Sequence, residues 1–225
     1  MSTLTKPKQI ISSVLKAVII LSAVIGIYMS AFATKTAFMS GSSTFMYFTI
    51  QSNILIALIA LIGGILLFRG QKIGNLWYVI KFVGTVSITL TGVVFCFVLA
   101  PTLGANAWNI QNVLTHVVVP LASIVDFFVT GTESEIKKIN VLYVTLPPLV
   151  YAIYAGIGYA MNWEFAPGIN YPYFFLNWGS EAGAFGFSVN LPFIGSAWWI
   201  LLLLLFLIIV GFCYLFILDK LKKRS

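Results

Sequence analysis

Charged residues are scarce in this sequence. They make up 8% of its 225 residues, whereas hydrophobic residues make up 60% and the mean hydropathy is +1.00. A chain of this size cannot bury so much apolar surface in a water-soluble domain, and runs of about 18 or more apolar residues are typical of membrane spans. Only helices or a closed barrel satisfy the backbone inside a bilayer. The apolar runs are continuous and do not alternate with polar residues, so we predict an all-α polytopic membrane protein.

Acidic residues are the rarer of the two charge types, with six Asp and Glu against thirteen Lys and Arg. The net charge of +7 does not indicate nucleic-acid binding, because no soluble basic domain is present to hold DNA or RNA. Twelve of the thirteen basic residues lie on the side that holds both termini, and Lys35 is the exception. By the positive-inside rule we therefore predict that both termini are cytoplasmic.

Cysteine and histidine are also scarce. The two cysteines, Cys96 and Cys213, fall in different spans and at different expected depths, so we predict no disulfide between them. Two isolated thiols and a single histidine do not supply the clustered ligands of a transition-metal site. We therefore predict neither a metal nor another cofactor. The sequence does not indicate an oligomeric state.

The apolar runs predict a single domain of six transmembrane helices. Ala31-Phe32-Ala33 resembles a signal-peptidase site, but the apolar run before it is longer than usual for a signal peptide. We therefore favour a retained first helix over a cleaved signal peptide. The third run stops at Pro101, and Pro147-Pro148 predict a kink in the fifth. The expected helices lie at about residues 10–33, 45–68, 76–99, 109–129, 139–161 and 196–218.

The only histidine, His116, lies inside the fourth apolar run. A titratable side chain in hydrocarbon is costly, so a functional site is the first hypothesis for it. Asn109, Asn112, His116 and Ser123 form one polar stripe at helical spacing. Pro120 has no N–H to donate to the carbonyl of His116, which predicts a bend there. In the alternative interpretation, the histidine only hydrogen-bonds a neighbouring helix.

The second run brings a hydroxyl to the depth of this histidine. With 1.5 Å of rise per residue, Thr49 lies about 6 Å and His116 about 10 Å below the outer interface. Both helices are expected to run inward, so the two side chains reach a similar depth. A threonine hydroxyl becomes a nucleophile when a base such as histidine removes its proton. Thr49 and His116 are therefore candidate catalytic residues.

Three polar side chains near this pair are candidates for orienting it or stabilising an oxyanion: Ser52, Asn53 and Asn112. Ser52 and Asn53 share a helix face with Thr49. No carboxylate is well placed to orient the imidazole, because Asp126 lies about 15 Å farther along the helix. In the alternative interpretation these residues only hydrogen-bond between helices, as Ser, Thr and Asn commonly do in membranes.

An outer segment at residues 162–195 carries ten aromatic residues interrupted by glycines. It is too interrupted for a span and too apolar for a freely solvated loop. We expect a re-entrant segment or a lid over a lipid-facing site, with Tyr171, Tyr173, Phe174 and Trp178 as candidate pocket or lid residues. The alternative is an aromatic belt that anchors the helices at the interface.

Three motifs carry a resemblance to a known family: Phe48-Thr49-Ile50-Gln51-Ser52-Asn53, Asn112-Val-Leu-Thr-His116-Val-Val-Val-Pro120 and Tyr171-Pro172-Tyr173. The chain resembles the bacterial branch of the androgen-induced-protein-like membrane family, also called the Pr6Pr family, from the first helix to the sixth. Eukaryotic members hydrolyse fatty acid esters of hydroxy fatty acids with a threonine and a histidine. The resemblance implies that Thr49 is the nucleophile and His116 the base. It also implies a bacterial cytoplasmic membrane as the location.

The chain departs from that family pattern in one place. Tyr-Pro-Tyr is usually followed by Pro-Phe-Leu-Asp in the bacterial branch, but here by Phe174-Phe175-Leu176-Asn177, so the acidic residue is absent. Our leading hypothesis is an integral-membrane hydrolase of lipid esters that acts from the outer half of the membrane. The alternatives are a non-enzymatic protein that binds a lipid or small molecule, possibly as a transporter, and a purely structural membrane protein.

Overall fold

The computed structural model of the chain describes residues 4–33, 41–70, 74–132 and 135–223. Lys35, the basic residue expected on the side away from the termini, lies outside the described residues. Within the described ranges, β-structure is limited to isolated bridges, and six helices are long and apolar enough to cross a membrane. The prediction of an all-α polytopic membrane protein is confirmed. The six helices span Lys6–Ala33, Phe48–Arg69, Asn75–Ala107, Ile110–Thr130, Lys138–Ala160 and Ser196–Lys222.

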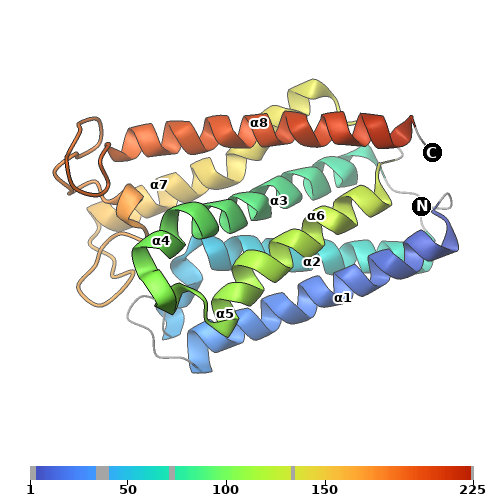
Figure 1. The fold of residues 1–225 in the computed structure, drawn as a ribbon, viewed down its shortest axis with the longest axis horizontal. Coiled ribbons are helices and arrows are strands. Elements are labelled where there is room, and N and C mark those ends of the chain that lie inside the picture. The colour runs from blue at the N-terminus through green and yellow to red at the C-terminus, as the bar shows by residue number, and fades with distance from the viewer. Residues whose placement is uncertain (1–3, 34–40, 71–73, 133–134, 224–225) are drawn as a thin grey trace.

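The helices form one bundle with two distinct ends. Helix α1 (Lys6–Tyr28) begins and helix α8 (Ser196–Lys222) ends at the same end, which we call the terminal end (Figure 1). Residues 162–195, drawn in orange, cover the opposite end, which we call the far end. Helix α2 (Phe48–Arg69) starts at the far end and runs back to the terminal end, where Gly70 closes it with a positive φ of 62°.

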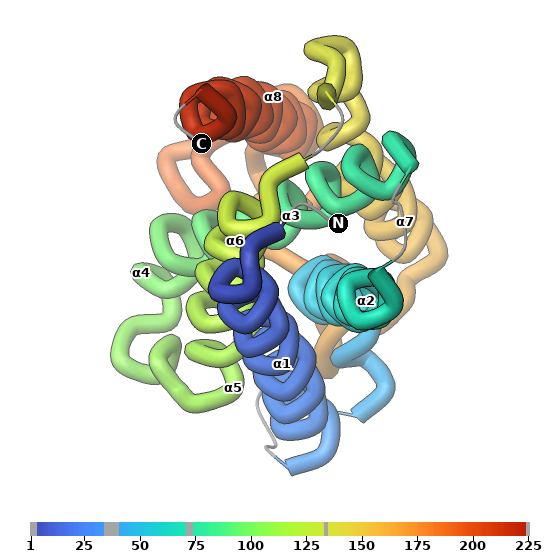
Figure 2. The backbone as a smooth tube through the Cα atoms, turned by 90° about the vertical axis from the view of Figure 1, so that its right-hand side faces the viewer, coloured from blue at the N-terminus to red at the C-terminus, as the bar shows by residue number. Residues whose placement is uncertain are grey.

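Helix α3 (Asn75–Val94) lies at the centre of the bundle. Together with α6 (Val119–Thr130) it lies between α8 on one side and α1 on the other (Figure 2). Its Phe82, Val86 and Ile88 side chains are fully buried. In contrast, α8 is apolar around its whole circumference and exposes large side chains outward, as expected for a helix that faces lipid. The exposed side chains of α8 include Leu201, Leu202 and Leu205.

Three helices change their hydrogen-bonding pattern near the far end. Five-residue π-helical turns lie at Met29–Ala33, Phe95–Leu99 and Leu114–Val118. Such turns occur frequently at functional sites because they displace side chains from the regular helical positions. The last of them carries His116 and directly precedes α6, whose second residue is Pro120. Because Ile110–Thr130 is one continuous helix, Pro120 lies within it and leaves a carbonyl of the preceding turn without a helical N–H donor.

Three prolines act differently from the sequence expectation. The third helix does not stop at Pro101, because Pro101 lies in the first turn of a short helix, α4 (Ala100–Leu103), which continues the path of α3. In the fifth helix, residues Lys138–Thr145 are 3₁₀-helical and α7 (Leu146–Ala160) has its prolines in the first turn. The expected irregularity at Pro147-Pro148 is therefore a change from 3₁₀ to α geometry.

Residues 162–195, which we call the cap, form a compact irregular cover. The cap contains one 3₁₀ turn at Phe174–Leu176 and two isolated bridges. Its inner side chains, Phe165 and Phe175, are buried against the bundle, whereas Phe187 is 76% exposed. The cap therefore contributes to the core of the far end and also presents aromatic side chains outward.

Candidate functional site

Thr49 and His116 lie in direct contact at the far end of the bundle. Thr49 is the second residue of α2, and His116 lies in the π-helical turn Leu114–Val118. The Thr49 Oγ1 atom is 3.2 Å from His116 Nε2. Both residues are buried, with 4% of each exposed. The two side chains selected from sequence are thus within hydrogen-bond distance of each other.

The hydrogen bond on the other side of the imidazole fixes its tautomer. His116 Nδ1 is 3.0 Å from the carbonyl oxygen of Asn112, and a carbonyl oxygen only accepts hydrogen bonds. Nδ1 therefore carries the proton, and the unprotonated Nε2 faces the Thr49 hydroxyl. Thr115 Oγ1 lies 3.1 Å from the same Nδ1 while donating to the carbonyl of Gln111. Thus a backbone carbonyl orients the imidazole, in the role that a carboxylate has in many hydrolases.

An aromatic ring covers the flat face of the imidazole. Phe95, in the π-helical turn that follows α3, stacks on His116 with 3.9 Å between ring centroids and 20° between planes. Trp108 packs edge-on against Phe95 at 5.5 Å. Because a stacked ring restrains rotation about the His116 side-chain bonds, Phe95 helps to keep Nε2 directed at Thr49.

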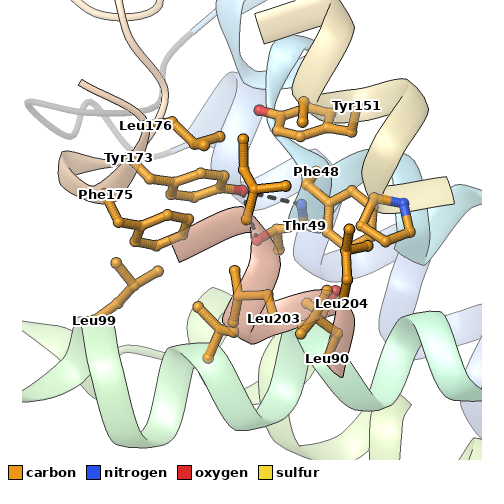
Figure 3. Close-up of a pocket in the computed structure, with 15 residues that line it drawn as sticks. Phe48, Thr49, Leu90, Leu99, Tyr151, Tyr173, Phe175, Leu176, Leu203 and Leu204 are labelled. Atoms are coloured by element: carbon orange, nitrogen blue, oxygen red, sulfur yellow. Dashed lines mark hydrogen bonds between the residues drawn. The ribbon is translucent and has the colours of Figure 1, made fainter. Parts of the chain in front are cut away.

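The cap brings a third polar group to the pair. The Tyr173 hydroxyl is 3.4 Å from Thr49 Oγ1, and it accepts a hydrogen bond of 3.3 Å from the backbone N–H of Thr49 (Figure 3). The ring of Tyr173 stacks on Phe175 at 5.1 Å and contacts Tyr47 edge-on. Burial raises the pKa of the Tyr173 hydroxyl, so this group stays neutral and keeps its proton.

Asn53 and Ser52 connect α2 to its neighbours. The Asn53 side-chain amide donates to the carbonyls of Thr49 and Thr115, at 2.8 and 3.1 Å. It therefore joins the two segments of chain that carry the nucleophile and base candidates. Ser52 Oγ is 2.7 Å from Thr91 Oγ1 of α3. These contacts fit the packing interpretation and the orienting role, whereas no contact of either side chain is directed at an oxyanion position.

Asn112 contributes through its backbone and not through its side chain. Its carbonyl accepts from His116, while its side-chain amide donates to the carbonyl of Ala107 at 2.9 Å. Its own N–H is held by the side chain of Asn109, which caps the short helix α5 (Ile110–Val113). Ser123, expected on the same polar stripe, bonds to the carbonyl of Val119 within α6. The polar residues predicted to form one stripe therefore lie before, within and after the π-helical turn, and they bond to different groups.

Thr49 also lines an apolar cavity, so the contact between Thr49 and His116 lies at the wall of this cavity. The cavity has a volume of about 60 Å³ and lies between α2, α3, α7, α8 and the cap. Hydrocarbon side chains and aromatic rings surround it on most sides (Figure 3). Its lining residues are Phe48, Thr49, Leu90, Thr91, Val94, Leu99, Pro148, Tyr151, Ala152, Tyr173, Phe175, Leu176, Ile200, Leu203 and Leu204. A nonpolar group in this space would lie beside the Thr49 hydroxyl.

The four cap candidates do not all reach this cavity. Tyr173 lines it, but Phe174 packs edge-on against Trp199 at 6.0 Å and Trp178 contacts Tyr159 at 5.6 Å. Tyr171 is half-buried and does not line the cavity. Phe174 and Trp178 therefore hold the cap on the bundle and do not form the pocket wall.

Sequence reasoning missed Phe95 and Tyr151. Both are aromatic residues within long apolar helices, where a ring that covers a site has the same sequence signature as a ring that faces lipid. The only available signal for Phe95 was its place near the end of the third span, level with His116. The threonines of α3 are equally alike in sequence, yet Thr91 lines the cavity, whereas Thr89 lies 2.8 Å from the Tyr214 hydroxyl.

The two cysteines, Cys96 and Cys213, are free thiols. Across the described ranges, no three His, Cys, Asp or Glu side chains gather as they would around a metal ion. The site described above presents a hydroxyl, an imidazole and a phenol. No protein-family model, curated protein or solved structure matches this chain.

Proposed function

We propose that this protein is an integral-membrane hydrolase of lipid esters, with Thr49 as nucleophile and His116 as general base. The observation that carries the proposal is the 3.2 Å approach of Thr49 Oγ1 to an Nε2 atom whose tautomer makes it a proton acceptor, at the wall of an apolar cavity. Enzymes of nucleophilic acyl transfer commonly contain a hydroxyl, a base that accepts its proton, and a third group that orients the base.

The first half of the reaction forms an acyl-enzyme. Thr49 Oγ1 attacks the ester carbonyl carbon while its proton passes to His116 Nε2. The tetrahedral intermediate then loses the alcohol, which takes the proton back from His116 as it leaves. The acyl group remains bound to Thr49 as an ester.

The second half releases the acyl group as a fatty acid. A water molecule attacks the acyl ester of Thr49 and gives a proton to His116 Nε2. The new intermediate collapses, the C–O bond to Thr49 breaks, and the proton on His116 returns to Thr49 Oγ1. The enzyme regains its starting state, and the sum of the two halves is ester plus water to acid plus alcohol.

Tyr173 is the best-placed group to stabilise the oxyanion in both halves. Its hydroxyl is 3.4 Å from Thr49 Oγ1 and remains protonated, so it is available as a donor. The backbone N–H of Thr49, in the first turn of α2, donates to this hydroxyl and so holds it beside Thr49 Oγ1. Hydrogen-bond donors directed at a developing negative charge commonly supply the largest single contribution to such reactions.

The substrate class follows from the cavity and from the family resemblance. The lining is hydrocarbon apart from a few hydroxyls, so this cavity of about 60 Å³ suits the hydrocarbon next to an ester group and not a charged head group. The resemblance to the Pr6Pr family adds fatty acid esters of hydroxy fatty acids as the substrate type. With the termini in the cytoplasm, the far end and its site lie in the outer half of the membrane.

Transport receives less support than hydrolysis. A transporter needs a polar route between the two ends of the bundle. The apolar cavity at the far end and a second cavity at the terminal end share no lining residue. We therefore do not propose a transport role for the Thr49–His116 pair.

The proposal is tested by hydrolysis of a fatty acid ester of a hydroxy fatty acid by the purified full-length chain in detergent. Thr49→Val keeps the shape of the side chain and removes the nucleophile, so we expect activity to fall at least about a thousandfold. Thr89→Val is the matched control, since Thr89 lies in α3 and bonds to Tyr214. Equal activity of wild type and Thr49→Val would overturn the proposal.

A further inference from the structure

A second cavity lies at the terminal end of the bundle, remote from the site above. Its volume is about 430 Å³, and it is bounded by α1, α2, α3, α6 and α8. Its lining includes four lysines, Lys8, Lys16, Lys81 and Lys222, and among the described residues that line it there is no Asp or Glu. We call it the basic cavity.

Two of these lysines are buried around a single carboxylate. Lys16 Nζ lies 2.6 and 2.8 Å from the two carboxylate oxygens of Asp126, and Lys81 Nζ lies 2.8 Å from Oδ2. Lys16 is 4% exposed, Lys81 8% and Asp126 3%. The carboxylate also accepts from Ser12 at 2.6 Å, and Lys81 donates to Thr130 at 2.6 Å. The hydrogen bonds of the cluster are thus well satisfied.

The charge of the cluster is not balanced. Among the described residues, two ammonium groups against one carboxylate leave one positive charge, and both lysines also line the cavity. Helix dipoles do not change this balance, because α3 begins and α6 ends beside the cavity and their charges are of opposite sign. A buried charge without a counter-charge is expensive. An anion in the cavity would supply the missing counter-charge.

We propose that the basic cavity binds a phosphate-bearing anion. Lys16 and Lys81 form its inner wall, and Lys8, exposed at the start of α1, lies at its outer side. Lysine ammonium groups bind phosphate as point charges, and a phosphate oxygen accepts hydrogen bonds from several of them. The phosphate belongs either to the head group of an anionic lipid in the adjoining leaflet or to a free ion. The proposal does not depend on ester hydrolysis, because no residue is shared between the two cavities.

The test measures the thermal unfolding midpoint of the full-length protein in a neutral detergent. One arm compares inorganic phosphate with chloride at constant ionic strength. The other compares phosphatidylglycerol with phosphatidylcholine. Saturable stabilisation by phosphate assigns a free-ion site, and stabilisation by phosphatidylglycerol alone assigns a head-group site. If phosphate stabilises no more than chloride, and phosphatidylglycerol no more than phosphatidylcholine, the proposal is overturned.

Two surface variants distinguish binding in the cavity from a general attraction of anions to the basic surface. Lys8 lines the cavity and Lys6 does not, although both are exposed on the same turn of α1. Removing one lysine from a phosphate contact is expected to weaken binding about fivefold. We therefore expect Lys8→Gln to raise the apparent Kd about fivefold and Lys6→Gln to leave it unchanged. Equal effects of the two variants would overturn the proposal.

Asp126→Asn gives a test of opposite sign. It removes the only carboxylate of the cluster and leaves two buried positive charges. Without added anion, we expect this variant to unfold at a lower temperature than wild type. When phosphate or phosphatidylglycerol is added, whichever of them stabilises wild type, we expect its unfolding midpoint to rise by more than that of wild type. A purely structural ion cluster predicts the loss of stability without the larger gain, and that result would overturn the proposal.

Discussion

Thr49 Oγ1 and His116 Nε2 lie 3.2 Å apart although 67 positions separate the two residues in the chain. The contact joins the start of α2 to a π-helical turn, and the Asn53 side chain joins the same two segments through their carbonyls. This pair, with the Tyr173 hydroxyl beside it, is the basis of the catalytic account and of the predictions that follow.

Activity should depend on the protonation of His116. Only the neutral ring can accept the proton of Thr49, so protonation at low pH removes the base. We expect the rate to rise with pH as the ring loses its proton, by about tenfold per unit below its pKa, and then to level off. The measurement is kcat/KM against pH, with folding followed by circular dichroism. A rate that does not fall at any acidic pH at which circular dichroism shows the protein to be folded would argue against a histidine base.

Removing the Tyr173 hydroxyl should lower kcat. Tyr173→Phe keeps the ring contacts with Phe175 and Tyr47 and removes only the donor near Thr49. Loss of one oxyanion donor typically costs about a hundredfold in rate. We expect a fall in kcat of about that size with little change in KM. Tyr171→Phe is the control, since Tyr171 does not line the cavity; a similar fall in both variants would contradict the oxyanion role.

Gly92 permits the close approach of α3 to the histidine turn. A Cβ atom at this position would lie 3.0 Å from the carbonyl oxygen of His116 and 3.2 Å from the Pro120 ring. Both are backbone or ring atoms that move little, so Gly92→Ala should shift the turn. We expect a loss of about 1–3 kcal/mol in stability together with lower activity.

Gly64→Ala provides the comparison for that variant. Its Cβ would meet only the flexible Lys16 side chain, at 3.7 Å. Denaturation of the protein in a mild detergent measures the stability of both variants, and the hydrolysis assay measures their activity. If Gly92→Ala proves as stable and as active as Gly64→Ala, then the position of the histidine turn does not depend on this contact.

Filling the apolar cavity should impair binding of long acyl chains. Leu203 lines the cavity, whereas its neighbour Leu202 is 51% exposed on the outer face of α8. Leu203→Trp should raise KM for long-chain esters about tenfold or more and affect short-chain esters less. Leu202→Trp adds the same ring toward lipid and should leave KM unchanged. Equal KM values for the two variants would show that the acyl chain lies elsewhere.

The fold class was accessible from sequence because hydrophobicity alone determines it. Continuous apolar runs identify six spans, and boundary errors occur where the chain departs from regular α-helix. At Pro101, for example, the chain begins a new helical segment at a position where proline is compatible with the first turn. Hydropathy does not distinguish that arrangement from the end of a span.

Part of the candidate site was also accessible, and the reason is geometric. Thr49 and His116 are scarce polar residues on helices that run in the same direction, so their depths could be compared from sequence. The group that orients His116 could not be predicted, because it is a backbone carbonyl, from Asn112, and every residue has one. The third partner, Tyr173, lies in the irregular cap, where spacing along the chain does not define direction.

The same limit applies to the basic cavity. The sequence shows lysines at the ends of helices, which the positive-inside rule explains without any binding site. Only the structure brings Lys16 and Lys81 together around Asp126, since these residues come from three different helices. Pairing between distant segments was therefore the information that the sequence lacked.

The most direct test of the catalytic account is covalent labelling of the purified protein with a fluorophosphonate, followed by mass spectrometry of the labelled peptide. This reagent reacts with a hydroxyl that an adjacent base activates, forming an O–P bond with loss of fluoride. We predict labelling at Thr49 that is absent in Thr49→Val and in His116→Gln, and retained in Thr89→Val. Folded wild-type protein that remains unlabelled, or a label on another residue that persists in Thr49→Val, would contradict the assignment of Thr49 as an activated nucleophile.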